Sequence, residues 1–174
     1  MKTSIALIGF MATGKSTIGN ALKIALGENY QFIETDQLII EMAGKSIPRI
    51  FSEDGEEQFR EYERLVCEKL SLLNRKIISC GGGLVLNNVN IENLKKNCHI
   101  VLLKATIEEI YRRAMKDGTE SRPVINTSDP LSEIKKNLKI REQLYEKAAE
   151  VIIDTTNRSI AEIASEIINK TKVN

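Results

Sequence analysis

Residues 9–16 read GFMATGKS and match the phosphate-binding pattern G-x-x-x-x-G-K-[ST] in full. The match lies between a short apolar run at 4–9 and a helical pattern at 15–26, which is the strand–loop–helix context that this motif requires. Glycines in such a loop let successive backbone N–H groups converge on phosphate oxygens, and the positive end of the helix dipole strengthens the attraction. The stretch therefore predicts a nucleotide site, whereas a plain glycine-rich turn with a solvated lysine would need neither flanking element.

Within this loop the chemistry assigns separate tasks. We expect Lys15 to place its ammonium group between the β- and γ-phosphates and Ser16 to offer its hydroxyl to Mg²⁺, which makes Mg²⁺ the expected cofactor. The residues expected to touch the nucleotide here are Ala12, Thr13, Gly14, Lys15, Ser16 and Thr17.

Outward from the loop, short β-branched runs alternate with longer helical periods along all 174 residues, a length typical of one domain. This alternation predicts a three-layer α/β/α fold, with helices on both faces of a five-stranded parallel sheet. The strands are expected at 4–9, 31–35, 76–79, 99–103 and 151–154. Ligands of such sheets bind beyond the carboxyl ends of the strands, so the residues that follow each strand are the candidates for function.

The composition excludes several other classes of protein. Lys and Arg number 25 and Asp and Glu 24, a balance that argues against a general nucleic-acid coat. No apolar run approaches the ~18–20 residues that span a bilayer, and the run at 4–9 is too short for a signal peptide. Three cysteines and one histidine fit neither a disulfide framework nor a zinc site. We expect a cytoplasmic monomer that binds neither nucleic acid nor membrane.

The third predicted strand separates the remaining nucleotide-binding classes. It runs into CGGG at 80–83, where oligomeric ATPases carry an acidic residue after four apolar ones. The tetrapeptide N-K-x-D, with which GTPases recognise guanine, is absent. A small chain with these features suggests a kinase that acts on a small molecule.

Further motifs, in this order, resemble the shikimate kinase family over nearly the whole chain. They are the phosphate-binding loop, Thr35-Asp36, DGEEQFR at 54–60 followed by Glu63, the glycine triplet 81–83, Arg122-Pro123, and Arg141 with Leu144-Tyr145. The resemblance implies a P-loop kinase fold of one domain over 1–174, with a helical substrate-binding segment at 36–74 and a small lid at 113–128. It also implies an enzyme that phosphorylates the 3-hydroxyl of shikimate with MgATP in the chorismate pathway.

The same resemblance implies the roles of individual residues. Asp36 would hold the acceptor hydroxyl, take up its proton and contact Mg²⁺ through water. Arg60 and Arg141 would bind the substrate carboxylate, because a guanidinium can donate two parallel hydrogen bonds to it, and Glu63 would hold Arg60. The glycines would let the backbone approach the substrate ring with N–H donors exposed. The implied substrate-binding set is Asp36, Arg60, Glu63, Gly81, Gly82, Gly83 and Arg141.

Three more arginines complete the implied site. Arg122 in the lid would swing over the γ-phosphate, and together with Asp36 and Lys15 it forms the expected catalytic set. Arg113 and Arg158 are candidates to sandwich the adenine, since guanidinium groups stack well on flat rings.

Two positions depart from the family pattern, and several alternatives stay open. Ala12 stands where the family commonly has glycine, which is tolerable if its φ is negative, and Glu34 stands where the family usually has aspartate. Asp36 also fits a helix N-cap, the glycines also fit a loop that needs unusual backbone angles, and each charged residue alone also fits a solvated surface. The alternatives for the whole chain are a gluconate or nucleoside monophosphate kinase and a non-catalytic nucleotide-binding domain.

Overall fold

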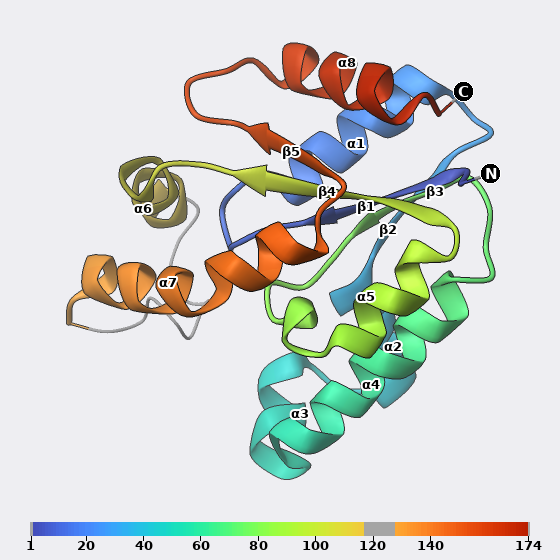
Figure 1. The fold of residues 1–174 in the computed structure, drawn as a ribbon. Coiled ribbons are helices and arrows are strands. Elements are labelled where there is room, and N and C mark those ends of the chain that lie inside the picture. Colours follow the sequence, from blue (N-terminus) through green and yellow to red (C-terminus); the bar gives the residue numbers. More distant parts are fainter. Residues whose placement is uncertain (1, 117–127, 174) are drawn as a thin grey trace.

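The fold is built on one parallel sheet, which we describe from a computed structural model covering residues 2–116 and 128–173. The strands lie in the order β2-β3-β1-β4-β5 (Figure 1). Their bounds are Ser4–Ile8 for β1, Gln31–Glu34 for β2, Lys76–Ser79 for β3, Cys98–Lys104 for β4 and Val151–Asp154 for β5. Every paired strand is parallel, and each end lies within one residue of its predicted place. The predicted five-stranded parallel α/β/α fold is therefore confirmed.

Helices cover both faces of the sheet, as Figure 1 shows. One face packs against α1 (Lys15–Leu26) and α8 (Ile160–Thr171) through Ile5 and Leu7 of β1. The opposite face packs through Ala6 and Ile8 against the remaining elements. These are α2 (Thr35–Ala43), α3 (Ile47–Glu53), α4 (Gly55–Leu70), the 3₁₀ turn η1 (Leu84–Leu86), α5 (Asn88–Lys95), α6 (Ile107–Lys116) and α7 (Pro130–Ala148). Because β1 is buried on both sides, its residues from Ile5 to Ile8 are all apolar.

Local signals explain several helix ends. The carboxylate of Asp129 accepts from the N–H of Ser132 at the start of α7, and Ser159 forms a full capping box with Glu162 at the start of α8. Helix α4 ends at Leu70, because the chain then closes in tighter turns, with the N–H of Leu73 donating to the carbonyl of Leu70.

Thr106 and Glu109 form only half of a capping box at the start of α6. The N–H of Glu109 donates to the Thr106 hydroxyl at 3.3 Å, whereas the Glu109 carboxylate accepts from Arg112 and Arg113. The Glu109 side chain is therefore part of a hydrogen-bond network with these two arginines, beside the carboxyl ends of the strands.

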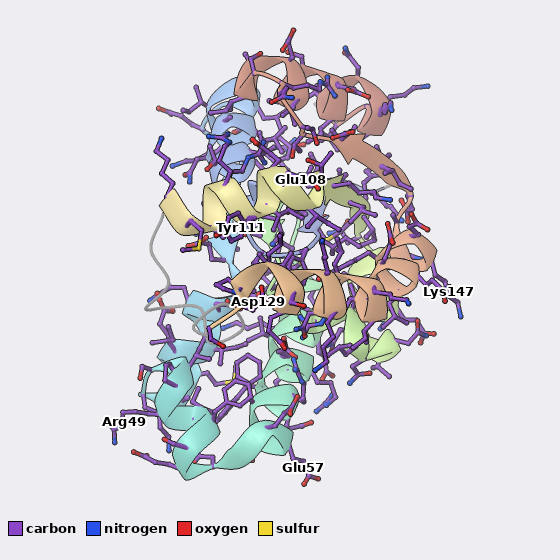
Figure 2. All side chains as sticks on the ribbon, turned by 90° about the vertical axis from the view of Figure 1, so that its left-hand side faces the viewer. Arg49, Glu57, Glu108, Tyr111, Asp129 and Lys147 are labelled. Carbon is purple, nitrogen blue, oxygen red and sulfur yellow. The ribbon has the colours of Figure 1, made fainter. Side chains whose placement is uncertain are left out.

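Figure 2 looks onto the carboxyl ends of the strands, the side toward which the arrows of Figure 1 point. Helix α6, marked by Glu108 and Tyr111, and helix α7, marked by Asp129 and Lys147, run across this side of the molecule (Figure 2). Within the described ranges, no helix is long and apolar enough to span a bilayer. The three cysteines are buried free thiols.

Candidate active site

A cavity of about 660 Å³ opens at the carboxyl ends of the strands. All six predicted nucleotide-contacting residues line it, within the stretch 11–18. Its other polar walls come from elements far apart in the sequence: Glu34, Asp36, residues 79–82, Arg112, Arg113, Lys116, Thr155 and Arg158. The topology thus gathers the residues that follow β1, β2, β3 and β5 at one place, as the rule for parallel sheets requires.

The phosphate-binding loop has the backbone that its glycines predict. Gly9 and Gly14 have φ angles of 143° and 96°, and a Cβ on Gly9 would collide with the carbonyl oxygen of Leu103. The Lys15 ammonium group donates to the carbonyls of Gly9 at 2.9 Å and Phe10 at 2.8 Å. The condition under which alanine is tolerable at position 12, a negative φ, is not met, because the φ of Ala12 is 58°. Alanine therefore occupies a left-handed conformation here, at the position where the family commonly has glycine.

A buried network that the sequence did not reveal supports this loop. The Thr155 hydroxyl lies 3.3 Å from the carbonyl oxygen of Thr13 and 3.1 Å from Nη1 of Arg113. Arg113 also donates to the Thr155 carbonyl at 2.9 Å and to the Glu109 carboxylate at 2.7 Å. The one available signal for Thr155 was its place directly after β5. The arginine expected at the adenine thus lines the cavity with its guanidinium group fixed from two sides.

The end of β2 brings two carboxylates to the cavity. The Ser16 hydroxyl donates to the Glu34 carboxylate. Helix α2 begins at Thr35 with Glu34 as its N-cap residue and no side-chain cap, so the alternative of Asp36 as N-cap is wrong. Burial raises the pKa of Asp36, and the nearby Lys15 ammonium group opposes that rise.

The glycine triplet is required for space rather than for backbone angles. None of Gly81, Gly82 and Gly83 has a positive φ, so the alternative based on unusual angles is wrong. A Cβ on Gly81 would lie 2.6 Å from Oδ1 of Asp36, and one on Gly83 would lie 2.6 Å from Nη1 of Arg60. The expected exposure of all three N–H donors is also corrected, because the N–H of Gly81 donates to the Thr35 hydroxyl at 2.8 Å.

Arg60 and Glu63 on α4 form the pair that their spacing predicts. Nη1 of Arg60 donates to Oε2 of Glu63 at 2.7 Å, and Glu56 accepts from the other side of the guanidinium group. The Glu63 side chain is only 2% exposed. Burial raises its pKa, and Arg60 opposes the rise. The alternative of a solvated charged face is therefore wrong for both residues.

Helix α7 approaches the triplet from the opposite side. The Tyr145 hydroxyl donates to the Gly82 carbonyl at 2.5 Å, and Nη1 of Arg141 reaches the same oxygen at 3.4 Å. Asp36, Arg60 and Arg141 thus each contact one glycine of the triplet. Neither arginine lines the 660 Å³ cavity itself, which ends at Gly82.

Two further predictions concern Arg158 and the lid that contains Arg122. Arg158 lines the cavity and is held by the Asp154 carbonyl at 3.1 Å and the Glu166 carboxylate at 2.7 Å. Arg122 and most of the lid predicted for 113–128 lie outside the described residues.

Comparison with known proteins identifies the family. A family model described as shikimate kinase matches residues 11–172. The chain belongs to the shikimate kinase family. It is 43% identical over 165 residues to a shikimate kinase of Caldanaerobacter subterraneus subsp. tengcongensis, covering 95% of this chain and 94% of the relative. A shikimate kinase of Clostridium botulinum is 42% identical over 156 residues, covering 88% and 89%.

Solved structures agree with this family. A shikimate kinase from Acinetobacter baumannii in complex with shikimate superimposes with a TM-score of 0.89 at 30% identity, covering 99% of this chain and 94% of that one. A shikimate kinase from Aquifex aeolicus gives a TM-score of 0.82 at 32% identity, covering 97% and 96%. A gluconokinase from Sinorhizobium meliloti, at 18% identity and a TM-score of 0.62, shares the fold alone. The fold alone therefore does not identify the acceptor.

Proposed function

We propose that this member of the shikimate kinase family transfers the γ-phosphate of ATP to the 3-hydroxyl of shikimate, a step toward chorismate and the aromatic amino acids. The observation that carries the proposal is the convergence of Asp36, Arg60 and Arg141 on the glycine triplet. The acceptor offers a hydroxyl to be deprotonated and a carboxylate to be held, and the three residues supply a base and two guanidinium groups.

In this proposal the nucleotide occupies the cavity. Residues 12–17 bind its phosphates through backbone N–H groups and the helix dipole of α1, and Lys15 moves from the loop carbonyls to the transferred phosphate. Arg113 and Arg158 flank the adenine, and Arg122 stabilises the charge that develops on the γ-phosphate.

The acceptor lies against the triplet. Asp36 accepts the proton of its hydroxyl, since burial has brought this carboxyl to a higher pKa and so to a stronger basicity. Arg60 and Arg141 hold the carboxylate, and Glu63 keeps Arg60 in place. Phosphoryl transfer needs mainly such positioning and charge neutralisation.

The residues at the end of β2 fit a magnesium ion bound together with ATP. Ser16, Glu34 and Asp36 all line the cavity and provide the hard oxygen ligands that Mg²⁺ prefers. No group of three carboxylate, imidazole or thiol side chains suited to a metal occurs within 2–116 and 128–173, so phosphate oxygens would complete the shell. When bound, Mg²⁺ neutralises negative charge on the phosphates.

A coupled assay of ADP release tests the proposal. With purified protein, MgATP and millimolar acceptor, we expect turnover with shikimate but not with gluconate or AMP. Release of ADP that does not depend on shikimate would contradict the proposal. Asp36→Ala should still bind ATP while losing turnover. Equal nucleotide binding with no turnover of any acceptor by either protein would favour a non-catalytic nucleotide-binding domain. A monomeric state and a cytoplasmic location remain predictions.

A further inference from the structure

We propose that Thr35 is a positioning residue of the transfer reaction, whose hydroxyl fixes the backbone of Gly81 and aligns the Asp36 carboxylate against it. The proposal rests on the function proposed above and assigns to Thr35 a task beyond its place in the sequence motif. Thr35 is fully buried, at 0% exposure, so its side chain has no contact with solvent.

The first observation concerns the ladder between β2 and β3. Its last backbone pair joins Glu34 to Ser79, after which the chain of β2 turns into α2. Beyond that pair the N–H of Cys80 donates to the carbonyl of Leu7 on β1, at 3.0 Å. Because successive N–H groups of a strand point to opposite sides, the N–H of Gly81 points toward β2, whose backbone no longer offers an acceptor.

The hydroxyl of Thr35 replaces that missing acceptor. Its Oγ1 accepts from the N–H of Gly81 at 2.8 Å, so the ladder continues by one hydrogen bond through a side chain. A buried N–H without a partner would be costly. The hydroxyl thereby fixes the first glycine of the triplet at the point where the sheet ends.

The second observation concerns Asp36. A hydroxyl that accepts one hydrogen bond still has its own proton to donate, and Oδ1 of Asp36 lies 3.5 Å from Oγ1 of Thr35. The same Oδ1 rests directly against Gly81, since a Cβ there would lie only 2.6 Å from it. The hydroxyl, the glycine backbone and the carboxylate therefore constrain one another, and a displacement of Gly81 would displace Asp36.

Two substitutions separate this task from simple core filling. Thr35→Val keeps the shape and removes the hydroxyl, whereas Thr35→Ser keeps the hydroxyl and removes the methyl group. Thr171→Val is a matched control, because Thr171 is also buried but its hydroxyl donates only within α8, to Ile167 and Ile168. Each variant is checked by circular dichroism and assayed well below its unfolding temperature.

We expect Thr35→Val to lower kcat roughly 10- to 100-fold. A displacement of the Asp36 carboxylate by up to about 1 Å from its reactive position has effects of this size. The KM for ATP should stay within about twofold of wild type, since the phosphate-binding loop is untouched. Thr35→Ser should recover most of kcat, and Thr171→Val should keep wild-type kinetics.

Two results would overturn the proposal: a Thr35→Val enzyme with wild-type kcat, or a Thr35→Ser enzyme as impaired as Thr35→Val. If Thr35→Val does not fold, Thr35→Ala takes its place under the same criteria. A wild-type protein that does not phosphorylate shikimate would refute the proposed function instead, so the two failures are distinguishable.

Discussion

The hydroxyl of Tyr145 donates a hydrogen bond of 2.5 Å to the carbonyl oxygen of Gly82, which lies 63 residues earlier in the chain. Arg141, one helical turn before Tyr145, approaches the same oxygen. The link fixes α7 relative to the glycine triplet, so Tyr145→Phe should loosen both Gly82 and Arg141.

We expect Tyr145→Phe to raise the KM for shikimate several-fold and to leave the KM for ATP unchanged. The partly buried carbonyl loses its shorter partner, a hydrogen bond that contributes about 0.5–1.5 kcal/mol of stability. Steady-state kinetics and thermal unfolding measure the two effects. Tyr62→Phe is the control, because its hydroxyl has no hydrogen-bond partner among the described residues; an equal effect there would contradict the assignment.

Arg60→Lys should raise the KM for shikimate about 10-fold or more, because an ammonium group cannot donate two parallel hydrogen bonds to a carboxylate. The charge and the pairing with Glu63 are largely kept, so the fold should survive. Arg49 on α3 is the matched control, since it belongs to the same helical segment at 36–74 but its side chain extends into solvent (Figure 2). A similar rise in KM for Arg49→Lys would sink the distinction between these two arginines.

Glu34→Gln should raise the Mg²⁺ concentration that gives half-maximal activity, by about 10-fold or more. The Glu34 carboxylate accepts a hydrogen bond from the Ser16 hydroxyl, so it orients this expected ligand of Mg²⁺, and its negative charge attracts the cation. A titration of activity with Mg²⁺ at saturating ATP measures this change. Glu41→Gln on the exposed side of α2 should leave the titration unchanged. An unaltered Mg²⁺ dependence in Glu34→Gln would argue against the proposed magnesium site.

Ala12→Gly should stabilise the protein, because an L-residue in the left-handed region costs about 1–2 kcal/mol. Glycine adds about 0.4–1 kcal/mol of unfolded-state entropy, which offsets part of the gain. A net increase of about 0.5–1 kcal/mol in the free energy of unfolding is therefore expected, measured by urea titration. Ala21→Gly in α1 should have the opposite sign, since glycine inside a helix costs about 1 kcal/mol. Destabilisation by both substitutions would contradict the strain at Ala12.

Glu109→Gln should reduce stability in a pH-dependent way. Hydrogen bonds from Arg112 and Arg113 lower the pKa of Glu109 to about 2, from 4.5 in the absence of these partners. A carboxyl with a lowered pKa stabilises the folded state above its unfolded pKa, and this contribution disappears as the pH falls toward the folded pKa. The stability difference between wild type and variant should therefore be full at pH 7 and shrink below about pH 4.5.

Urea titrations at pH 7, 5 and 3 measure this difference. Glu108→Gln is the control, because the adjacent Glu108 lies exposed on the outer side of α6 (Figure 2). A stability difference for Glu109→Gln that stays constant over this range would show that charge pairing is not its cause.

The sequence predicted the strands and the loop because their signals are local. A strand buried on both faces is largely apolar, as β1 is from Ile5 to Ile8. A phosphate-binding loop carries its glycines at a fixed spacing before the helix that follows it. The pair Arg60 and Glu63 was equally accessible, since residues three apart share a helix face.

Contacts between distant segments could not be obtained in this way. Thr155 reaches the carbonyl of Thr13 across 142 residues, and no spacing encodes such a contact. The φ of 58° at Ala12 depends on how the whole phosphate-binding loop folds, and residue type alone does not give it. The triplet showed the same difficulty, because its need for space arises from side chains on α2 and α4.

The filled space around the triplet constrains how acceptor choice can change in evolution or in design. A side chain at Gly81 would displace Asp36 and one at Gly83 would displace Arg60, so neither position can alter selectivity without damage to the chemistry. At Gly82 a methyl group would meet its neighbours only at 3.7 Å or more, on a wall of the cavity. New acceptors are therefore more accessible through the middle glycine and through side chains of α4 and α7 than through either flanking glycine.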